Sequence, residues 1–337
     1  MTQRDTAHIM ELIDLWLGYR PDNYLLKQVN AKIGQGEMIA LVGRNGTGKS
    51  TLLRTIAGIQ HAARGGVKLN GRSIETTHQR QLASWISFVG TGSSITENLT
   101  VFEMVSLGRH PYTNWWGALG VVDRQKINES LRFVGMEEFS GARIDRLSDG
   151  ERQRVMIAMA LAQDTKIIIL DEPTAFLDIP NRIGIVEVLH KLKADGRSVI
   201  YSTHEFDNVF TYADKIWVIH NQRIIEGAPE DLGMDKVFEE IFRDADVAFD
   251  QENLRFVREI NPGKKIFLDA EDQHVEYWTY RALERIGFRV VREYEENLLR
   301  VTARKEKGRY QWNIEEKHTT TAFKSLYALA GYLIIEN

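Results

Sequence analysis

The first 235 positions combine two hydrophobic periods, one typical of strands and one typical of helices. Residues 9–17 alternate between apolar and polar types, as in a half-buried strand. Four short apolar runs predict further strands, at 37–43, 86–89, 167–170 and 198–202. Helical periodicity follows at 49–58, 100–162 and 181–194. Strands that alternate with helices predict a parallel sheet whose functional edge lies at the carboxyl ends of its strands.

The pattern changes after about residue 235. Residues 236–260 are charged and helix-prone, and Asn261-Pro262-Gly263 is a break. Beyond the break, strand patterns occur at 265–269, 289–294, 298–303 and 310–314, and helical patterns at 274–286 and 320–334. We therefore predict a domain over 1–240, a linker at 241–262 and a separate small α+β domain over 263–337.

Composition narrows the classes of function. The 337 residues include 43 Lys and Arg against 47 Asp and Glu, for a net charge of −4, which argues against a protein that coats nucleic acid in general. Because the chain has no cysteine, disulfides, cysteine-ligated zinc, iron–sulfur clusters and thiol catalysis are excluded. The most apolar runs, 167–170 and 327–335, are far shorter than the roughly 20 residues that span a bilayer. We expect any membrane role to involve a partner.

A phosphate-binding turn follows the strand pattern at 37–43. Residues 43–50 read Gly-Arg-Asn-Gly-Thr-Gly-Lys-Ser and match G-x-x-x-x-G-K-[ST], with a strand before and a helix after. Glycines let backbone N–H groups surround a polyphosphate, and the helix N-terminus adds partial positive charge. Lys49 is expected to reach the β and γ phosphates, and the Ser50 hydroxyl to coordinate Mg²⁺. The predicted nucleotide-binding residues of this turn are Gly43, Arg44, Asn45, Gly46, Thr47, Gly48, Lys49, Ser50 and Thr51.

Two carboxylates follow the apolar run at 167–170. Asp171 and Glu172 end this strand and are therefore delivered to the sheet edge near the phosphate-binding turn. We expect Asp171 to hold Mg²⁺, directly or through water, and Glu172 to act as the general base that polarises the attacking water. The alternative is a solvated strand end before a turn at Pro173, which the neighbouring phosphate-binding turn disfavours.

A further motif lies just upstream of the carboxylate strand. Leu147-Ser148-Asp149-Gly150-Glu151 resembles L-S-G-G-Q, the signature motif of ATP-binding-cassette (ABC) ATPases. The other motifs of that family follow in order: Ala175-Phe176-Leu177-Asp178 resembles the D-loop, and Ser202-Thr203-His204 resembles the strand end that has the switch histidine. Tyr19 stands where the family has an aromatic residue that stacks on adenine. The resemblance covers about 9–230.

The resemblance implies the α/β fold of P-loop NTPases, with a parallel-sheet core and a helical subdomain at about 92–160. It also implies a head-to-tail homodimer in which each ATP contacts the phosphate-binding turn of one subunit and the signature motif of the other. His204 then contacts the γ-phosphate and the water as a catalytic residue beside Glu172. Ser148 also begins a capping box with Glu151, so a plain helix N-cap is its alternative role. Core packing is the alternative for Tyr19, and an ordinary acid near a helix start for Asp178.

Two residues depart from the family pattern. The family has a glutamine after the strand at 86–89, whereas this chain reads Val89-Gly90-Thr91. The Thr91 hydroxyl is a shorter candidate ligand for Mg²⁺ or water. Asp149 replaces the first glycine of the signature motif. Because a carboxylate would repel a γ-phosphate, we expect Asp149 to face away from it.

The resemblance also implies partners. In the family, the helical insertion at 92–147 grips an integral-membrane permease, and the segments 99–103 and 107–112 resemble the ATPases of importers for iron–siderophore complexes, haem and cobalamin. An ATPase subunit of such an importer hydrolyses Mg-ATP at the inner face of the cell membrane as a cytoplasmic, peripheral protein. A periplasmic or surface substrate-binding protein is an indirect partner, and nucleic acid is not a partner. The alternatives are a soluble ABC ATPase that acts on nucleic acid or ribosomes, and an exporter ATPase.

Aromatic residues outside these motifs have two interpretations each. Trp115-Trp116 is either a pair that faces a partner or a pair tucked against its own subdomain. In the C-terminal domain we favour core packing over a ligand site for five aromatic residues, Tyr277, Trp278, Tyr280, Tyr310 and Trp312. The spacing of His274 and His318 does not favour a metal site. We expect this domain to regulate or to assist assembly.

Overall fold

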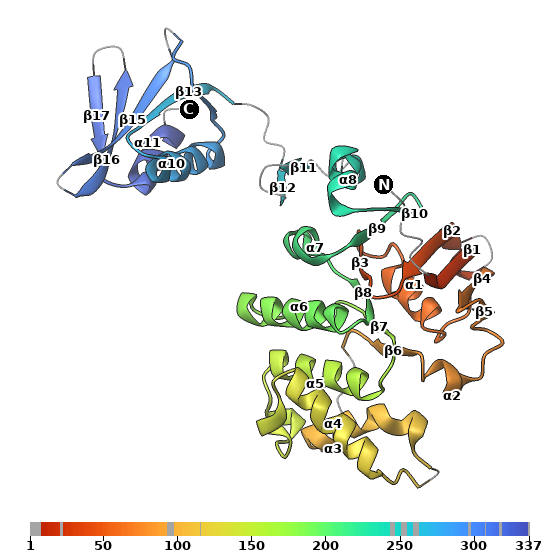
Figure 1. Ribbon diagram of the computed structural model, residues 1–337. Helices are drawn as coiled ribbons and strands as arrows, with labels where there is room; N and C mark the ends of the chain where they lie inside the picture. Colours follow the sequence, from red (N-terminus) through yellow and green to blue (C-terminus); the bar gives the residue numbers. More distant parts are fainter. Residues whose placement is uncertain are drawn as a thin grey trace, which may run out of the picture. The chain divides into compact units, whose positions relative to one another are not determined.

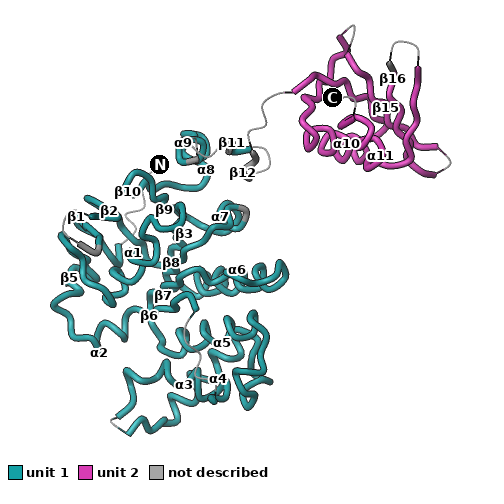
Figure 2. Tube along the Cα trace, turned by 180° about the vertical axis from the view of Figure 1, so that it is seen from behind, with its two compact units in different colours: residues 1–245, 249–256 teal, residues 246–248, 257–337 magenta. Residues whose placement is uncertain are grey.

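A computed structural model describes most of the chain. The described residues are 8–20, 23–92, 98–114, 116–242, 247–250, 255–258, 263–295, 298–306, 308–316 and 319–335. The chain divides into two compact units, shown in teal and magenta in Figure 2. Unit 1 comprises 1–245 and 249–256, and unit 2 comprises 246–248 and 257–337.

The central sheet of unit 1 has six strands in the order β10-β9-β3-β8-β7-β6 (Figure 1). Its strands are β3 (Met38–Gly43), β6 (Ile86–Val89), β7 (Ile167–Leu170), β8 (Ser198–Ser202), β9 (Lys215–His220) and β10 (Arg223–Gly227). All neighbours are parallel except β10, which is antiparallel to β9. The four predicted buried strands are confirmed, and β9 and β10 are additions that the sequence analysis did not anticipate. The carboxyl ends of β3, β6, β7 and β8 therefore share one edge.

A second, antiparallel sheet has the order β2-β1-β4-β5. Its strands are β1 (His8–Arg20), β2 (Asn23–Gly34), β4 (Arg64–Leu69) and β5 (Arg72–Ser73). The strand predicted at 9–17 is confirmed within β1. The analysis missed β2, although Val29, Ala31 and Ile33 alternate with polar residues and are buried.

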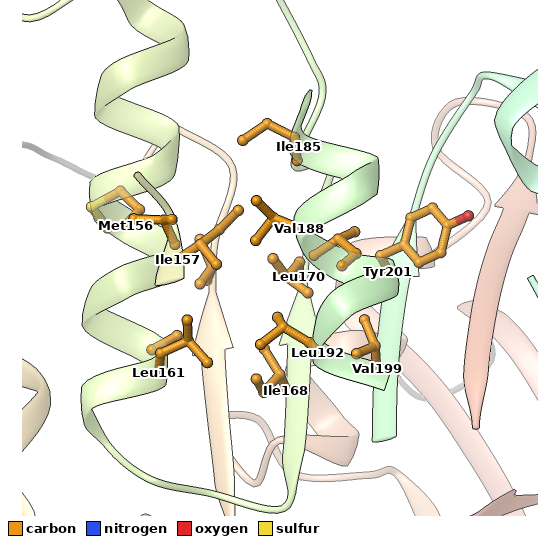
Figure 3. Packing of buried hydrophobic residues seen from close by; sticks show 14 of the residues in the cluster. Met156, Ile157, Leu161, Ile168, Leu170, Ile185, Val188, Leu192, Val199 and Tyr201 are labelled. Atoms are coloured by element: carbon orange, nitrogen blue, oxygen red, sulfur yellow. The ribbon is translucent and has the colours of Figure 1, made fainter. Parts of the chain in front are cut away.

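Strand β3 separates two hydrophobic cores because its successive side chains point to opposite faces of the sheet. Ile39 and Leu41 pack with helix α1 and the antiparallel sheet, whereas Ala40 and Val42 pack in the core formed with helices α5 and α6. Figure 3 shows part of this second core, where Ile168 and Leu170 of β7 lie between the side chains of α5 and those of α6. Burial on both faces explains why these strands read as continuous apolar runs.

The helices of unit 1 confirm the predicted helical stretches. The long stretch predicted at 100–162 forms α3, α4 and α5, with short 3₁₀ turns between them. The helices are α1 (Lys49–Ile56), α2 (Gln79–Leu82), α3 (Val101–Ser106), α4 (Val121–Phe133), α5 (Asp149–Ala162), α6 (Ile179–Ala194), α7 (Phe206–Tyr212), α8 (Pro229–Met234) and α9 (Val237–Phe242). Among the described residues, no helix combines the length and the apolar composition needed to cross a bilayer.

The range predicted as a linker, 241–262, has secondary structure in its described parts. Strand β11 (Val247–Asp250) pairs with β12 (Arg255–Arg258), so the helical expectation for 236–260 is wrong beyond α9. Phe249 is buried, with its ring 5.6 Å from that of Phe210 and 5.2 Å from that of Phe238. This aromatic cluster places Phe249 in the core of unit 1.

Unit 2 has one five-stranded sheet in the order β14-β13-β15-β16-β17. Its elements are β13 (Lys265–Ala270), α10 (Gln273–Arg285), β14 (Arg289–Val291), β15 (Leu299–Glu306), β16 (Arg309–Glu316), β17 (Thr319–Phe323) and α11 (Leu326–Ile335). Strand β13 is parallel to β14 and β15, and the remaining pairs are antiparallel. The closing helix predicted at 320–334 is wrong over its first residues, where β-branched threonines form β17.

The aromatic residues of unit 2 do not share one environment. Trp312 is buried, and its indole N–H donates to the Thr279 hydroxyl at 2.8 Å. Tyr277, Trp278 and Tyr280 of α10 are exposed, so the expectation of core packing is wrong for these three. Tyr310 is half-buried beside Trp312 and borders the core.

The remaining histidine and tryptophan predictions have mixed outcomes. His274 is exposed, and the described residues contain no group of three or more His, Cys, Asp or Glu side chains arranged to hold a metal ion. His318 and Trp115 lie outside the described residues. Trp116 is 87% exposed, which contradicts a position tucked against its own subdomain.

We predict that residues 1–261 fold by themselves and depend on Phe249. Replacing a buried phenylalanine by alanine typically costs about 3–5 kcal/mol in the free energy of unfolding. Phe249→Ala in the 1–261 chain should lower its thermal midpoint by several degrees, whereas Ile59→Ala, at an exposed position, should leave it nearly unchanged. Denaturation followed by circular dichroism measures both. An insoluble 1–261 chain, or equal midpoints for the two variants, would contradict the prediction.

Candidate active site

The turn between β3 and α1 has the backbone geometry expected for a phosphate-binding loop. Gly46 and Gly48 adopt positive φ angles of 78° and 105°, which side chains with a Cβ atom rarely tolerate. Gly48 is the N-cap of α1 and offers no side chain, so no side-chain hydrogen bond caps this helix end. A helix N-terminus without a side-chain cap suits an anion.

Lys49 lies folded against this turn. Its Nζ atom donates to the main-chain oxygens of Gly43 at 2.9 Å and of Arg44 at 3.3 Å, and its side chain is buried. Burial lowers the pKa of Lys49 below its usual value, and the negative charges of Glu172 and Asp171 oppose that shift. The two carboxylates therefore lie within electrostatic range of Lys49, and the sequence analysis expected them near this turn.

Asp171 is fixed at the edge of the sheet by the strands on both sides of β7. The register pairs Leu170 of β7 with Tyr201 of β8, which places the following residues, Asp171 and Ser202, opposite each other. The Ser202 hydroxyl donates to Asp171 Oδ1 at 2.8 Å, and the Asp171 N–H donates to the main-chain oxygen of Val89 at 2.8 Å. Asp171 is only 2% exposed, so its carboxylate is held in one direction.

Glu172 adopts a left-handed backbone conformation, with φ of 51°. Such a conformation in a residue with a Cβ atom is strained and persists only when neighbouring contacts hold it. The Glu172 N–H donates to the Ser202 hydroxyl oxygen at 2.8 Å. Its Oε1 atom lies 2.8 Å from Nε2 of His204, so the predicted base and the predicted switch histidine are in contact.

Thr91 has a main-chain partner. Its hydroxyl donates to the carbonyl oxygen of Asp171 at 2.8 Å. The side chain therefore reaches the carboxylate strand, but through the backbone rather than through the carboxylate. The role of Thr91 as a ligand of Mg²⁺ stays a prediction.

The signature motif begins helix α5. Ser148 and Glu151 form a reciprocal capping box: the Glu151 N–H donates to the Ser148 hydroxyl, and the Ser148 N–H donates to the Glu151 carboxylate at 2.8 Å. The hydrogen bonds that the Ser148 N–H and hydroxyl donate to the Glu151 carboxylate hold the pKa of Glu151 below its usual value. Asp149 is exposed and pairs with Arg152 at 3.2 Å. A Cβ atom on Gly150 would lie 2.5 Å from the Asn181 side chain, so a larger residue at this position would displace that side chain. The motif Leu147–Glu151 thus has a definite local structure, and its contact with a partner's ATP stays a prediction.

The D-loop segment connects the carboxylates to helix α6. Asp178 caps α6 by accepting the N–H of Asn181 at 3.1 Å, as an acid near a helix start does. Phe176 in the same loop is 90% exposed with φ of 65°. The side chain of Tyr19 lies outside the described residues, so its stacking on adenine stays a prediction.

The structure thus joins Lys49, Asp171, Glu172 and His204 in one site and adds Ser202, which the sequence analysis named only as part of a strand end. The sequence contains a signal for this contact. Ser202 ends β8 and Asp171 directly follows β7, so the parallel pairing of these two strands places the hydroxyl opposite the carboxylate.

Comparisons with known proteins give matches in both units of the chain. The profile of the family described as "ABC transporter" matches residues 26–175, and the profile described as "Iron ABC transporter C-terminal domain" matches residues 263–333. An ABC transporter ATP-binding protein of Methanocaldococcus jannaschii, itself uncharacterised, is 37% identical over 261 residues, which cover 76% of this chain and 89% of that protein. The iron(3+)-hydroxamate import ATP-binding protein FhuC of Bacillus subtilis is 34% identical over 239 residues, covering 70% of this chain and 88% of FhuC.

A solved structure is similar as well. A dimeric ATP-binding cassette bound to ADP and phosphate, in a post-hydrolysis state, matches with a TM-score of 0.58 and 28% identity. The match covers 65% of this chain and 98% of that chain. The predicted fold, a P-loop NTPase cassette, and the predicted ATPase activity are therefore confirmed.

We predict that Lys49→Ala weakens ATP binding about tenfold or more. The substitution removes a charge-assisted hydrogen bond to phosphate, worth roughly 1.5–3 kcal/mol. Titration with a fluorescent ATP analogue measures the affinity. Lys191→Ala, at an exposed position on α6, serves as the control and should bind as the unchanged chain does. Equal affinities for the Lys49 and Lys191 variants would contradict the role of Lys49.

We predict that Glu172→Gln keeps ATP binding and slows hydrolysis by about 10²–10⁴, the usual effect of losing a positioned general base. The glutamine keeps the size of the side chain but accepts a proton poorly. Steady-state phosphate release measures the rate, and Glu187→Gln on the exposed side of α6 is the matched control. Hydrolysis at the normal rate in Glu172→Gln would assign the base to another residue.

Proposed function

Because the chain is a member of the ABC transporter family of ATPases, we propose that it drives the uptake of an iron chelate through a separate membrane permease. The observation that carries this proposal is the iron-transporter C-terminal domain at 263–333. The similarity to FhuC supports the same cargo class. Of the three cargoes that the sequence analysis considered, iron–siderophore complexes therefore rank ahead of haem and cobalamin, and import ranks ahead of export or action on nucleic acid.

Within this function we propose that Glu172 takes a proton from the attacking water. The contact with His204 at 2.8 Å orients the carboxylate side chain, which supports this role. In the same proposal, His204 contacts the γ-phosphate and the same water. Lys49 and the N-terminal N–H groups of α1 bind the phosphates, because both offer hydrogen-bond donors with positive charge or partial charge.

The residues at this edge also fit Mg²⁺. The Ser50 hydroxyl and the Asp171 carboxylate are hard oxygen donors, and Mg²⁺ is usually held by one or two protein oxygens together with substrate phosphates. Bound Mg²⁺ would neutralise charge on the β and γ phosphates. Asp171 is buried and oriented by Ser202, which prepares its second oxygen for a ligand role.

We propose that two copies of the chain form a head-to-tail homodimer. The support is the start of α5, where Ser148 stands at a helix N-terminus and the charge of Asp149 is paired with Arg152. Such an end attracts the phosphates of a nucleotide that a second subunit presents. The similar cassette that was solved as a dimer with ADP and phosphate supports the same arrangement.

The permease is proposed to bind the helical subdomain at the inner face of the membrane, where ATP is available. Trp116, Val121 and Val122 are exposed large apolar side chains in this subdomain. Apolar residues that gather on a surface favour contact with another protein. A substrate-binding protein outside the membrane would deliver the iron chelate to the permease, and no nucleic-acid partner is proposed.

The experiment is an uptake assay in the native cell with the chromosomal gene changed to Glu172→Gln. We predict that uptake of a ⁵⁵Fe-labelled hydroxamate siderophore falls at least tenfold, because hydrolysis limits transport, while uptake of labelled haem and cobalamin is unchanged. The Glu187→Gln strain is the control. A defect confined to haem or cobalamin would overturn the cargo, and normal uptake of all three would overturn the role in import.

A further inference from the structure

Two hydroxyl groups hold the single peptide unit that joins Asp171 to Glu172. The carbonyl oxygen of this unit accepts the Thr91 hydroxyl at 2.8 Å, and its N–H donates to the Ser202 hydroxyl oxygen at 2.8 Å. Thr91 follows β6 and Ser202 ends β8, so the two hydroxyls come from the strands on either side of β7. The C=O group and the N–H group of this peptide unit are thereby held by residues that lie on opposite sides of β7.

We propose that Thr91 and Ser202 are positioning residues that together clamp this peptide unit and so hold the catalytic carboxylate of Glu172 in its productive direction. The inference rests on the proposed roles of Asp171 and Glu172 in ATP hydrolysis, and it adds the residues that orient them. Neither hydroxyl needs to touch the nucleotide for this role.

The backbone of Glu172 explains why a clamp is needed. A φ of 51° at a residue with a Cβ atom is unfavourable, and rotation of the preceding peptide unit would relieve it. Because this peptide unit ties the Cα atom of Glu172 to the end of β7, a peptide unit that can turn no longer fixes the direction of the Glu172 side chain, which contacts His204 at 2.8 Å. Holding the peptide at its carbonyl and at its N–H prevents this rotation.

Ser202 has a second task in the same arrangement. Its hydroxyl proton goes to Asp171 Oδ1 at 2.8 Å, while its oxygen accepts the Glu172 N–H. One fully buried hydroxyl therefore sets both the side chain of Asp171 and the backbone of Glu172. The clamp couples the direction of the proposed metal ligand to that of the proposed base.

The clamp also gives Thr91 a purpose at the position where related ATPases have a glutamine. Threonine is short and stiff about χ1, so it suits a fixed hydrogen bond to a neighbouring strand. The residues that follow it lead into the helical subdomain, whose first helix is α3.

The test compares ATP hydrolysis by Thr91→Val, Thr91→Ser and Ser202→Ala in the full-length chain. Thr91→Val keeps the shape and removes the hydroxyl, and we expect kcat to fall about three- to tenfold, as for the loss of one hydrogen bond. KM for ATP and the affinity for a fluorescent ATP analogue should stay within twofold. Thr91→Ser restores the hydroxyl and should restore kcat. Ser202→Ala should lower kcat by at least as much as Thr91→Val.

A double variant tests whether the two hydroxyls act on one peptide unit. Once one of the two hydrogen bonds to the peptide unit is lost, loss of the other should reduce kcat by a smaller factor. The double variant Thr91→Val with Ser202→Ala should therefore lower kcat by clearly less than the product of the two single effects. An effect equal to that product would overturn the shared clamp. Normal kcat in Thr91→Val, or a Thr91→Ser variant as slow as Thr91→Val, would overturn the role of Thr91.

Thr165→Val is the matched control for simple loss of a buried hydroxyl. Thr165 lies at the opposite ends of the same strands, where its hydroxyl is 3.0 Å from both the Ser87 hydroxyl and the Ile167 carbonyl oxygen. We expect this variant to unfold at a lower temperature with unchanged kcat. If Thr165→Val loses as much kcat for a given fall in unfolding temperature as Thr91→Val does, then Thr91 acts only on stability and the proposal fails.

Glu172→Gln, assayed in parallel, separates the clamp from the function on which it rests. Near-complete loss of hydrolysis in Glu172→Gln with normal clamp variants would overturn the clamp alone. Normal hydrolysis in Glu172→Gln would overturn the proposed base and the clamp with it. Because the assay uses the isolated ATPase, its result does not depend on the transported cargo.

Discussion

The position of strand β7 between β6 and β8 is the constraint on which the site depends. Its four residues are apolar and buried on both faces, so the strand has no freedom to shift without exposing them. Parallel pairing on both sides then sets the point at which the chain leaves the sheet. Asp171 and Glu172 are the first residues beyond that point, and hydroxyls from the two neighbouring strands are within hydrogen-bonding distance of them.

The same constraint explains which parts of the site the sequence could predict. The phosphate-binding turn and the capping box at Ser148 are local in sequence, because their hydrogen bonds join residues a few positions apart. Thr91 lies 80 positions from Asp171 in the sequence and Ser202 lies 31 positions from it, yet the hydroxyls of both contact Asp171. They follow from strand order and register, which periodicity alone does not give. A predicted order of β6-β7-β8 would have been enough to place both hydroxyls beside the carboxylates.

The fold shows the same division between local and distant information. The sequence predicts the strands β3, β6, β7 and β8 and the long helices, but it misses β2 and β10, which lie at sheet edges, and β9, whose central residues are buried. In unit 2, the pattern at 320–334 predicts a single helix, but its first residues belong to β17 and the helix α11 begins only at Leu326. The exposed aromatic residues of α10 show why residue type alone is a weak guide to burial: Thr279 is fully buried among them because it bonds to Trp312.

The hydrogen bonds of Lys49 indicate why its ammonium group would bind a polyphosphate in preference to the backbone carbonyl oxygens of the turn. Its ammonium group donates to two neutral carbonyl oxygens of the turn, and burial disfavours its charge. A phosphate oxygen is a better acceptor for a buried ammonium group than a neutral carbonyl oxygen, because the two opposite charges also attract each other. The negative charges of Asp171 and Glu172 oppose the effect of burial on the pKa of Lys49, and Ser202 and His204 contact these two carboxylates. The lysine can thus exchange its carbonyl partners for an anion, while Ser202 and His204 hold the two acids in place for the reaction.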